Sequence, residues 1–131
     1  MAKRSALKTV GAFCLCAAIT PVSLPVLAMS DVLDTPAMTT HLAANSLLLD
    51  LSRAGERLVA VGERGHIVYS DDFGESWSQA EVPVSTTLTG VYFPGESKGW
   101  AVGHGGVILH SSDRGETWVK QMDGHEGSEL V

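Results

Sequence analysis

Three histidines of this 131-residue chain could bind a metal ion as neutral imidazoles: His66, His104 and His110. Their spacing fits no zinc pattern, and neither a cysteine nor a His-Glu-x-x-His element accompanies them. When the chain is aligned with itself so that Trp77 falls on Trp118, His66 lies opposite Val107 and His110 opposite Tyr69. Packing within a repeated column therefore explains the histidines better than metal binding. We expect neither a metal nor a cofactor.

Four arginines could grip the carboxylate of a substrate: Arg53, Arg57, Arg64 and Arg114. All four fall in expected loops or turns, and no acidic residue paired with a tyrosine obviously converges on them. We therefore expect no enzyme, no catalytic residue and no small-molecule substrate.

Acidic residues outnumber basic ones after residue 28. All 15 Asp and Glu residues lie there with only six Lys and Arg, which leaves a formal charge of −9. An acidic surface without a basic run argues against nucleic acid and anionic membranes as partners. It is compatible with a basic protein partner, although many exported domains are simply acidic.

An eight-residue motif occurs twice and organises the rest of the chain. Residues 70–77 read SDDFGESW and residues 111–118 read SSDRGETW, so both fit Ser-x-Asp-x-Gly-x-Ser/Thr-Trp. When residues 60–77 are aligned with residues 101–118, ten of the 18 positions are identical. A period of roughly 40 residues, built from short strands, is typical of propeller blades.

The residue types of the motif suit a tight turn. The aspartate can accept bonds from backbone N–H groups, the glycine allows a left-handed conformation, and the hydroxyls can satisfy further turn groups. We expect each tryptophan to be buried against a neighbouring blade, and a structural role rather than a catalytic or calcium-binding one. The structural residues expected are Ser70, Asp72, Gly74, Ser76 and Trp77, then Ser111, Asp113, Gly115, Thr117 and Trp118.

Four short strands are expected in each repeat. They span residues 47–51, 58–62, 65–70 and 77–80, then residues 88–93, 99–103, 106–111 and 118–121. Both third strands carry apolar residues on both faces, as expected for strands covered on both sides. The sequence thus predicts an all-β fold of two four-stranded antiparallel propeller blades, residues 47–80 and 88–121.

Residues 1–28 are predicted to be a signal peptide. Three basic residues precede an apolar run over residues 10–19, and two prolines lead to a cleavage site after Ala28. An uncleaved membrane anchor is the alternative, because residues 9–28 are mostly apolar. Cys14 and Cys16 would leave with the signal, so the exported chain would have no disulfide. Residues 29–46 are expected to be an exposed lead-in, in which residues 38–42 could pair as an edge strand, and residues 122–131 a tail.

The repeated motif resembles the Asp box, or BNR repeat, of sialidases, sortilin-type receptors and other propellers, where it joins the third and fourth strands of a blade. Residues 99–109, GWAVGHGGVIL, followed by the second box, closely resemble the repeat of the photosystem II stability/assembly factor family. Residues 88–93, LTGVYF, fit the strand that opens that family's blade, and the resemblance covers residues 47–121. It implies part of a seven-bladed propeller, exported to a periplasm or thylakoid lumen. Photosynthetic members escort photosystem II proteins during assembly.

The resemblance favours an exported, non-enzymatic scaffold that binds a protein partner while a membrane complex is assembled. Arg64, His104 and Arg114 are the candidate partner-binding residues, because each is expected in an exposed loop. A sialidase-like glycosidase fragment is an alternative, although the Phe/Tyr-Arg-Ile-Pro signature of sialidases is missing. A truncated propeller piece without function is another.

Two blades are fewer than the roughly 4 to 8 of a closed propeller. The chain is therefore expected to be a fragment of a longer protein. Alternatively, several copies form a homo-oligomeric ring, or another polypeptide supplies the remaining blades.

Overall fold

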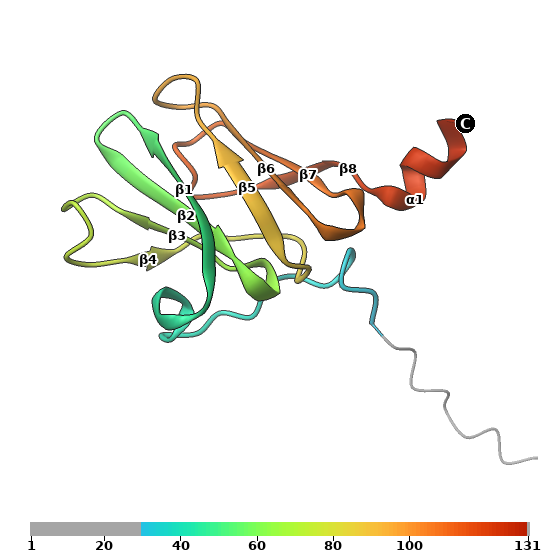
Figure 1. Cartoon of the computed structure of the whole chain (residues 1–131), viewed down its shortest axis with the longest axis horizontal. Coiled ribbons are helices and arrows are strands. Elements are labelled where there is room, and N and C mark those ends of the chain that lie inside the picture. The colour runs from blue at the N-terminus through green and yellow to red at the C-terminus, as the bar shows by residue number, and fades with distance from the viewer. Residues whose placement is uncertain (1–29, 131) are drawn as a thin grey trace, which may run out of the picture.

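The computed structural model describes residues 30–130, where eight strands form two four-stranded antiparallel sheets (Figure 1). The first sheet, blade 1, contains β1 (Leu48–Ala54), β2 (Arg57–Gly62), β3 (Ile67–Ser70) and β4 (Ser78–Gln79). The second sheet, blade 2, contains β5 (Leu88–Tyr92), β6 (Gly99–Gly103), β7 (Ile108–Ser111) and β8 (Val119–Met122). Each sheet follows the order of the chain, as in a propeller blade, so the predicted all-β fold is confirmed. The predicted signal peptide lies outside the described residues.

Short helical turns connect and flank the strands. They are η1 (Ala43–Asn45), η2 (Glu63–Gly65), η3 (His104–Gly106), α1 (Gly124–Gly127) and η4 (Ser128–Leu130). The turns η2 and η3 occupy the start of the expected third strands, so β3 and β7 each begin two residues late. In the expected tail, Asp123 caps the start of α1, because its carboxylate accepts the N–H groups of His125 and Glu126.

The two blades repeat each other's strand pairing. Leu58 of β2 pairs with Ser70 of β3, and Gly99 of β6 pairs with Ser111 of β7, which are the positions that the alignment of the two Asp boxes makes equivalent. The first strands are shifted by one position from this alignment, because Leu51 pairs with Ala60 whereas Val91 pairs with Ala101. The chain between these equivalent paired residues is therefore one residue longer in blade 2 than in blade 1.

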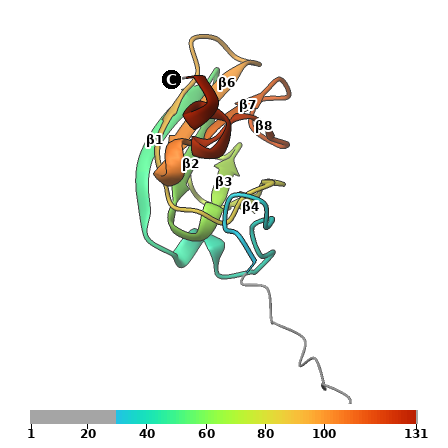
Figure 2. The same ribbon diagram turned by 90° about the vertical axis from the view of Figure 1, so that its right-hand side faces the viewer.

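The hydrophobic core lies between the blades, which pack face to face. Figure 2 shows β1 at one side of the molecule and β4 and β8 at the other. The first strands of the two sheets, β1 and β5, also contact each other. The sheets therefore lie side by side, with their first strands at one edge and their fourth strands at the other. Blade 1, blade 2 and the segment between them all supply buried side chains: Val59, Val61, Ile67, Val82, Val84, Val91, Phe93, Ala101, Leu109 and Trp118.

The lead-in is neither fully exposed nor a strand over residues 38–42, so the predicted edge strand is wrong. Leu33 and Ala43 are buried, and the N–H of Ala37 donates to the carbonyl of Val82 at 3.0 Å. The side chain of Gln79 bonds the N–H of Thr40 and the carbonyl of Met38, each at 2.9 Å. A side chain of the two-residue strand β4 thus satisfies backbone groups that a ladder would otherwise pair.

Only one third strand is covered on both faces as predicted. In β3, Ile67 and Val68 point to opposite faces and are both buried. In β7, Leu109 is buried but Ile108 is only half-buried. The difference arises because Ala43 of the lead-in and the Trp77 ring cover Val68 on the outer face of blade 1. Among the described residues, Ile108 on the outer face of blade 2 has no comparable cover.

Candidate partner-binding surface

The first Asp box closes the turn between β3 and β4 with a local hydrogen-bond network. Ser70 Oγ donates to Asp72 Oδ1 at 2.7 Å and accepts the N–H of Gly74 at 2.8 Å. Asp72 Oδ1 accepts the N–H of Ser76 at 2.8 Å, and Asp72 Oδ2 accepts its hydroxyl. The indole N–H of Trp77 donates to the carbonyl of Gly74 at 3.1 Å.

The second Asp box, between β7 and β8, repeats each of these bonds. Gly115 N–H donates to Ser111 Oγ at 2.9 Å, and Asp113 accepts the N–H and hydroxyl of Thr117 at 3.0 and 2.5 Å. The indole of Trp118 donates to the carbonyl of Gly115 at 3.0 Å. The boxes therefore use their polar groups to hold their own turns.

The box carboxylates are poorly suited to proton donation. The hydroxyl and N–H of Ser76, then the Ser70 hydroxyl, lower the pKa of Asp72 to about 2. Partial burial acts to raise the pKa of Asp113, but the bonds from Thr117 and Ser111 outweigh it, so this pKa also lies below its ordinary value. A glycosidase acid needs a raised pKa instead.

The two box tryptophans have different surroundings. Trp118 is 4% exposed and packs edge-on against Phe93, with ring centroids 5.8 Å apart at 82°. Trp77 is only half-buried and lines a groove on the outer face of blade 1. The prediction that both rings are buried against a neighbouring blade therefore holds for Trp118 alone.

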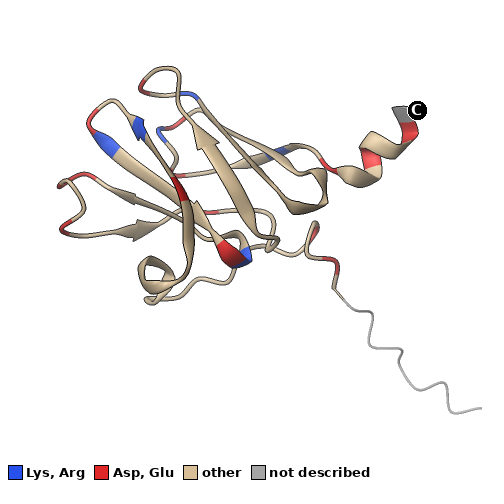
Figure 3. Cartoon of the chain, viewed as in Figure 1, with Lys and Arg blue, Asp and Glu red and all other residues tan. Residues whose placement is uncertain are grey.

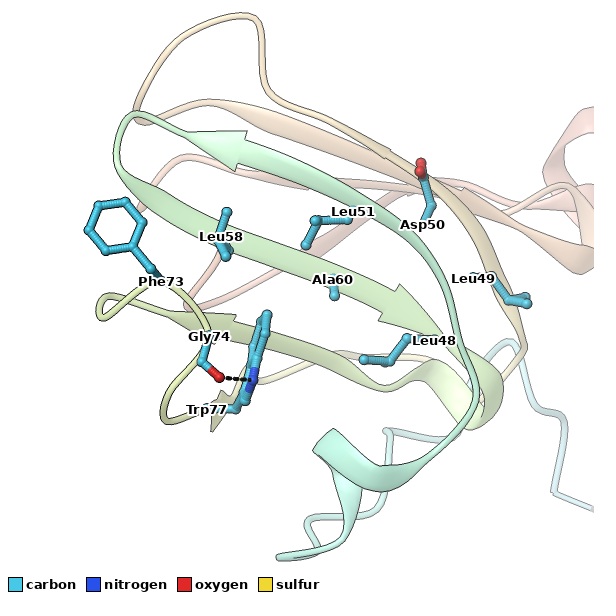
Figure 4. Close-up of a pocket in the computed structure, with 9 residues that line it drawn as sticks. All are labelled: Leu48, Leu49, Asp50, Leu51, Leu58, Ala60, Phe73, Gly74 and Trp77. Atoms are coloured by element: carbon cyan, nitrogen blue, oxygen red, sulfur yellow. Dashed lines mark hydrogen bonds between the residues drawn. The ribbon is translucent and has the colours of Figure 1, made fainter.

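The groove beside Trp77 has a volume of about 520 Å³ and a mainly apolar lining (Figure 4). In the close-up, the Trp77 ring lies over the same face of the sheet as Leu48, Leu51, Leu58 and Ala60. The groove is completed by Leu49, Asp50, Phe73 and Gly74. Sequence analysis missed this groove, because no local pattern distinguishes an uncovered blade face from a covered one.

Arg57 is the centre of a charged cluster that joins the blades. It is 6% exposed, and its Nε and Nη2 donate to the two oxygens of Asp71 at 2.7 and 2.8 Å. Its Nη1 donates to Glu116 at 2.9 Å, and its guanidinium lies 4.4 Å from the centroid of the Tyr69 ring. Arg57 therefore begins β2 rather than lying in a loop, and its donors are occupied within the protein instead of facing a substrate.

Arg64 and His104 lie at the same end of the two blades. Each is exposed in the short turn between the second and third strands, η2 in blade 1 and η3 in blade 2. The backbones of both turns are anchored, because Glu63 N–H donates to Leu47 at 3.0 Å and His104 N–H donates to Thr87 at 2.9 Å.

Arg114 lies away from these two residues and is half-buried, which corrects its predicted exposure. It belongs to the Asp-box turn, at the opposite end of the third strand from η3. Its N–H donates to Ser97 at 3.0 Å, and its carbonyl accepts from Arg57 at 3.4 Å. Its Nε is buried without a partner among the described residues. The structure thus brings together only two of the three candidate residues.

The histidines considered for metal binding are dispersed. His66 is buried with Nδ1 3.1 Å from Ser46 Oγ, and burial, followed by the charge of Arg64, lowers its pKa. The ring of His110 lies 4.9 Å from that of Trp100. Within residues 30–130, no three His, Cys, Asp or Glu side chains are grouped to hold a metal ion.

Basic and acidic residues are interspersed along the described chain, and most of the lysines and arginines lie at the end of the sheets that holds the β1–β2 hairpin (Figure 3). Figure 3 shows the acidic residues mainly in turns and at the C-terminal helix, with few lysines and arginines between them. In the part of the chain that the structure describes, no helix is long and apolar enough to cross a membrane.

Two four-stranded sheets, each with an Asp-box turn between its third and fourth strands, define a pair of β-propeller blades. The chain belongs to the family of the photosynthesis system II assembly factor YCF48, whose family model matches residues 31–125. Among the matching solved structures, one described as YCF48 bound to D1 peptide is 27% identical, with a TM-score of 0.50 over 56% of this chain. The match covers 25% of that protein, so this chain spans about a quarter of its length. A comparison with curated proteins finds no match.

Proposed function

We propose that this chain is part of an exported, non-enzymatic propeller scaffold that binds a segment of a membrane protein while its complex is assembled. The family match over residues 31–125 carries the proposal, and the likeness to YCF48 bound to D1 peptide supports a peptide as the bound element. A periplasm or thylakoid lumen is the compartment that fits such a partner.

The proposed binding surface consists of the turns η2 and η3, with Arg64 and His104 as its exposed side chains. Because backbone hydrogen bonds hold both turns, little backbone order is lost when a partner binds. The Arg64 guanidinium can bind a carboxylate or peptide carbonyls, and His104 can donate or accept. Arg114 is left out, because it lies at the other end of the blades.

Peptide binding tests this surface. A fluorescent D1 peptide is titrated with the chain, and anisotropy is compared with that of a scrambled peptide of the same composition. Arg64→Ala and His104→Ala should each weaken binding about threefold to tenfold. Arg53→Ala, which removes an exposed arginine from the β1–β2 hairpin at the other end, is the matched control and should not. Equal binding of both peptides, or an unchanged affinity in Arg64→Ala, would exclude the proposed surface.

We propose no enzymatic activity because the acidic and basic side chains that could act on a substrate are already hydrogen-bonded within the protein. Asp72 and Asp113 are bonded within their turns, and Arg57 is bonded to two carboxylates. A fluorogenic sialoside should therefore be hydrolysed no faster with the chain than in buffer. Turnover above the blank that increases with protein concentration would favour the glycosidase alternative.

A further inference from the structure

Each blade has one open face among the described residues. On blade 1 this is the Trp77 face, defined as Leu48, Leu51, Leu58, Ala60 and Trp77. On blade 2 it is the Trp100 face, defined as Tyr92, Trp100, Val102, Ile108 and Val119, which lies opposite the side packed on blade 1. Large apolar side chains are exposed on both, since Leu51 is 54% exposed and Tyr92 65%. Exposed apolar surface of this kind marks an interaction site.

The Trp77 face repeats a face that is buried inside the molecule. In blade 2, Leu88 and Val91 occupy the strand positions of Leu48 and Leu51, and Trp118 occupies that of Trp77. Those blade 2 residues are at most 8% exposed, because blade 1 covers them. The Trp77 face therefore has the composition of a surface built to be covered by a blade.

The Trp100 face repeats the surface that does the covering. In blade 1, Val59, Val61 and Ile67 face blade 2 and are fully buried. Their counterparts in the second repeat are Trp100, Val102 and Ile108, of which Val102 is 44% exposed. The same molecule thus presents both halves of a blade–blade contact, one at each end.

The ion pair across the internal contact has an unused counterpart. Arg57 of blade 1 pairs with Glu116 of blade 2 at 2.9 Å. Lys98 is equivalent to Arg57 and lies on the side of the Trp100 face, and Glu75 is equivalent to Glu116 and lies on the side of the Trp77 face. Both are exposed, and neither pairs with a charged group within residues 30–130. They are of opposite sign and lie where the internal contact has its own ion pair.

We propose that a second copy of this chain docks its Trp100 face on the Trp77 face, so that the contact between copies repeats the contact between blades. Such a contact is head to tail, and it closes a ring if the rotation between successive blades allows. Closed propellers have roughly 4 to 8 blades, which corresponds to about two to four copies. Asp50 and Ser52 of blade 1 accept the N–H groups of Val91 and Phe93 of blade 2. Gly90 and Tyr92 stand at their positions in blade 2, so the contact between copies is the more apolar one. The inference does not depend on the proposed function.

The test is the mass of the full chain in solution, by light scattering and sedimentation velocity between about 1 and 100 µM, with any processing of the N-terminus checked by mass spectrometry. We expect a discrete assembly. Leu51→Glu alters only the Trp77 face and Val102→Glu only the Trp100 face, so each should weaken association at least tenfold. Val32→Glu, which changes a 49% exposed residue outside both faces, is the control and should leave the assembly intact.

Mixing the two variants distinguishes head-to-tail docking from other modes. Leu51→Glu retains an intact Trp100 face and Val102→Glu an intact Trp77 face, so the mixture should form a one-to-one dimer although each alone is monomeric. A wild-type monomer at about 100 µM would overturn the proposal. So would association that either variant leaves unchanged, or a mixture that stays monomeric.

Exchanging the charges of Lys98 and Glu75 provides a second test. It applies if circular dichroism shows that Leu51→Glu or Val102→Glu does not fold. Lys98→Glu changes an exposed residue, places it near Glu75 of the docked copy and should weaken association severalfold. Adding Glu75→Lys to the same chain should restore it, because the pair is re-formed with reversed sign. Equal association of the single and double variants would contradict the docking register.

Discussion

The Arg57 guanidinium lies 2.9 Å from the Glu116 carboxylate and joins the start of β2 in blade 1 to the Asp box of blade 2. The same arginine bonds Asp71 of its own blade at 2.7 Å and is 6% exposed. Because Arg57 bonds residues of both blades, it helps to hold blade 1 and blade 2 in their relative orientation. Hydrogen bonding to Asp71 and Glu116 raises its pKa further above its ordinary range, so it is charged at every pH at which the protein folds.

Removing this link should destabilise the pair of blades. Arg57→Ala loses charge-assisted bonds, which contribute about 1.5–3 kcal/mol in typical cases. Both carboxylates left behind remain partly in water, at 57% and 50% exposure, so the cost should stay below the roughly 3–5 kcal/mol of a fully buried broken pair. Urea unfolding measures it. Arg53→Ala is the control, and an equal loss in both variants would contradict the role of Arg57.

The two tryptophans of the Asp boxes should differ in their contribution to stability. Trp118→Ala empties a packed site and should cost about 3–5 kcal/mol in the free energy of unfolding. Trp77→Ala should cost less than half as much in the monomeric chain, because its ring is half-exposed at the groove. Unfolding monitored by circular dichroism at a concentration where the chain is monomeric gives both values. Equal costs would mean that the groove is closed in solution.

Stability should fall as the pH falls from about 4 to about 2. Hydrogen bonds from Ser76 and Ser70 hold the pKa of folded Asp72 at about 2, whereas the ordinary value is 3.8. A lowered folded pKa contributes stability above the ordinary value, and this stability is lost as the pH falls through the folded value. Urea midpoints at pH 5, 3 and 2 should therefore drop less in Asp72→Asn than in wild type. Parallel pH profiles would refute the assignment.

The two ends of the described chain should be joined more strongly at low pH. His125 Nε2 lies 2.9 Å from Asp31 Oδ2, and this bond, followed by the charges of Asp31 and Asp123, raises the pKa of His125. The contribution is fully present below the ordinary value of 6.5 and is lost as the pH rises through the raised value. An NMR titration should show the pKa of His125 falling in Asp31→Asn but not in Glu56→Gln. An unchanged titration in Asp31→Asn would show that the ends are not paired.

The sequence alone determined the features that depend on local chemistry. The internal repeat predicted eight strands in two blades and membership of a family of Asp-box propellers, and both are confirmed. The bonds within each box join residues no more than four apart, so the motif by itself is sufficient to specify the turn. Glycine and aspartate form such turns wherever the chain continues as a strand.

Only the tertiary structure decided which surfaces are covered. Arg57 bonds a residue 59 positions away, and Arg114 is half-buried although it lies in a turn. Trp77 and Trp118 have the same motif around them, yet only Trp118 has another blade against it. Whether a side chain is buried depends on which segments pack against it in the folded protein. Equivalent residues of the two repeats therefore differ in exposure wherever only one of them is covered by another segment.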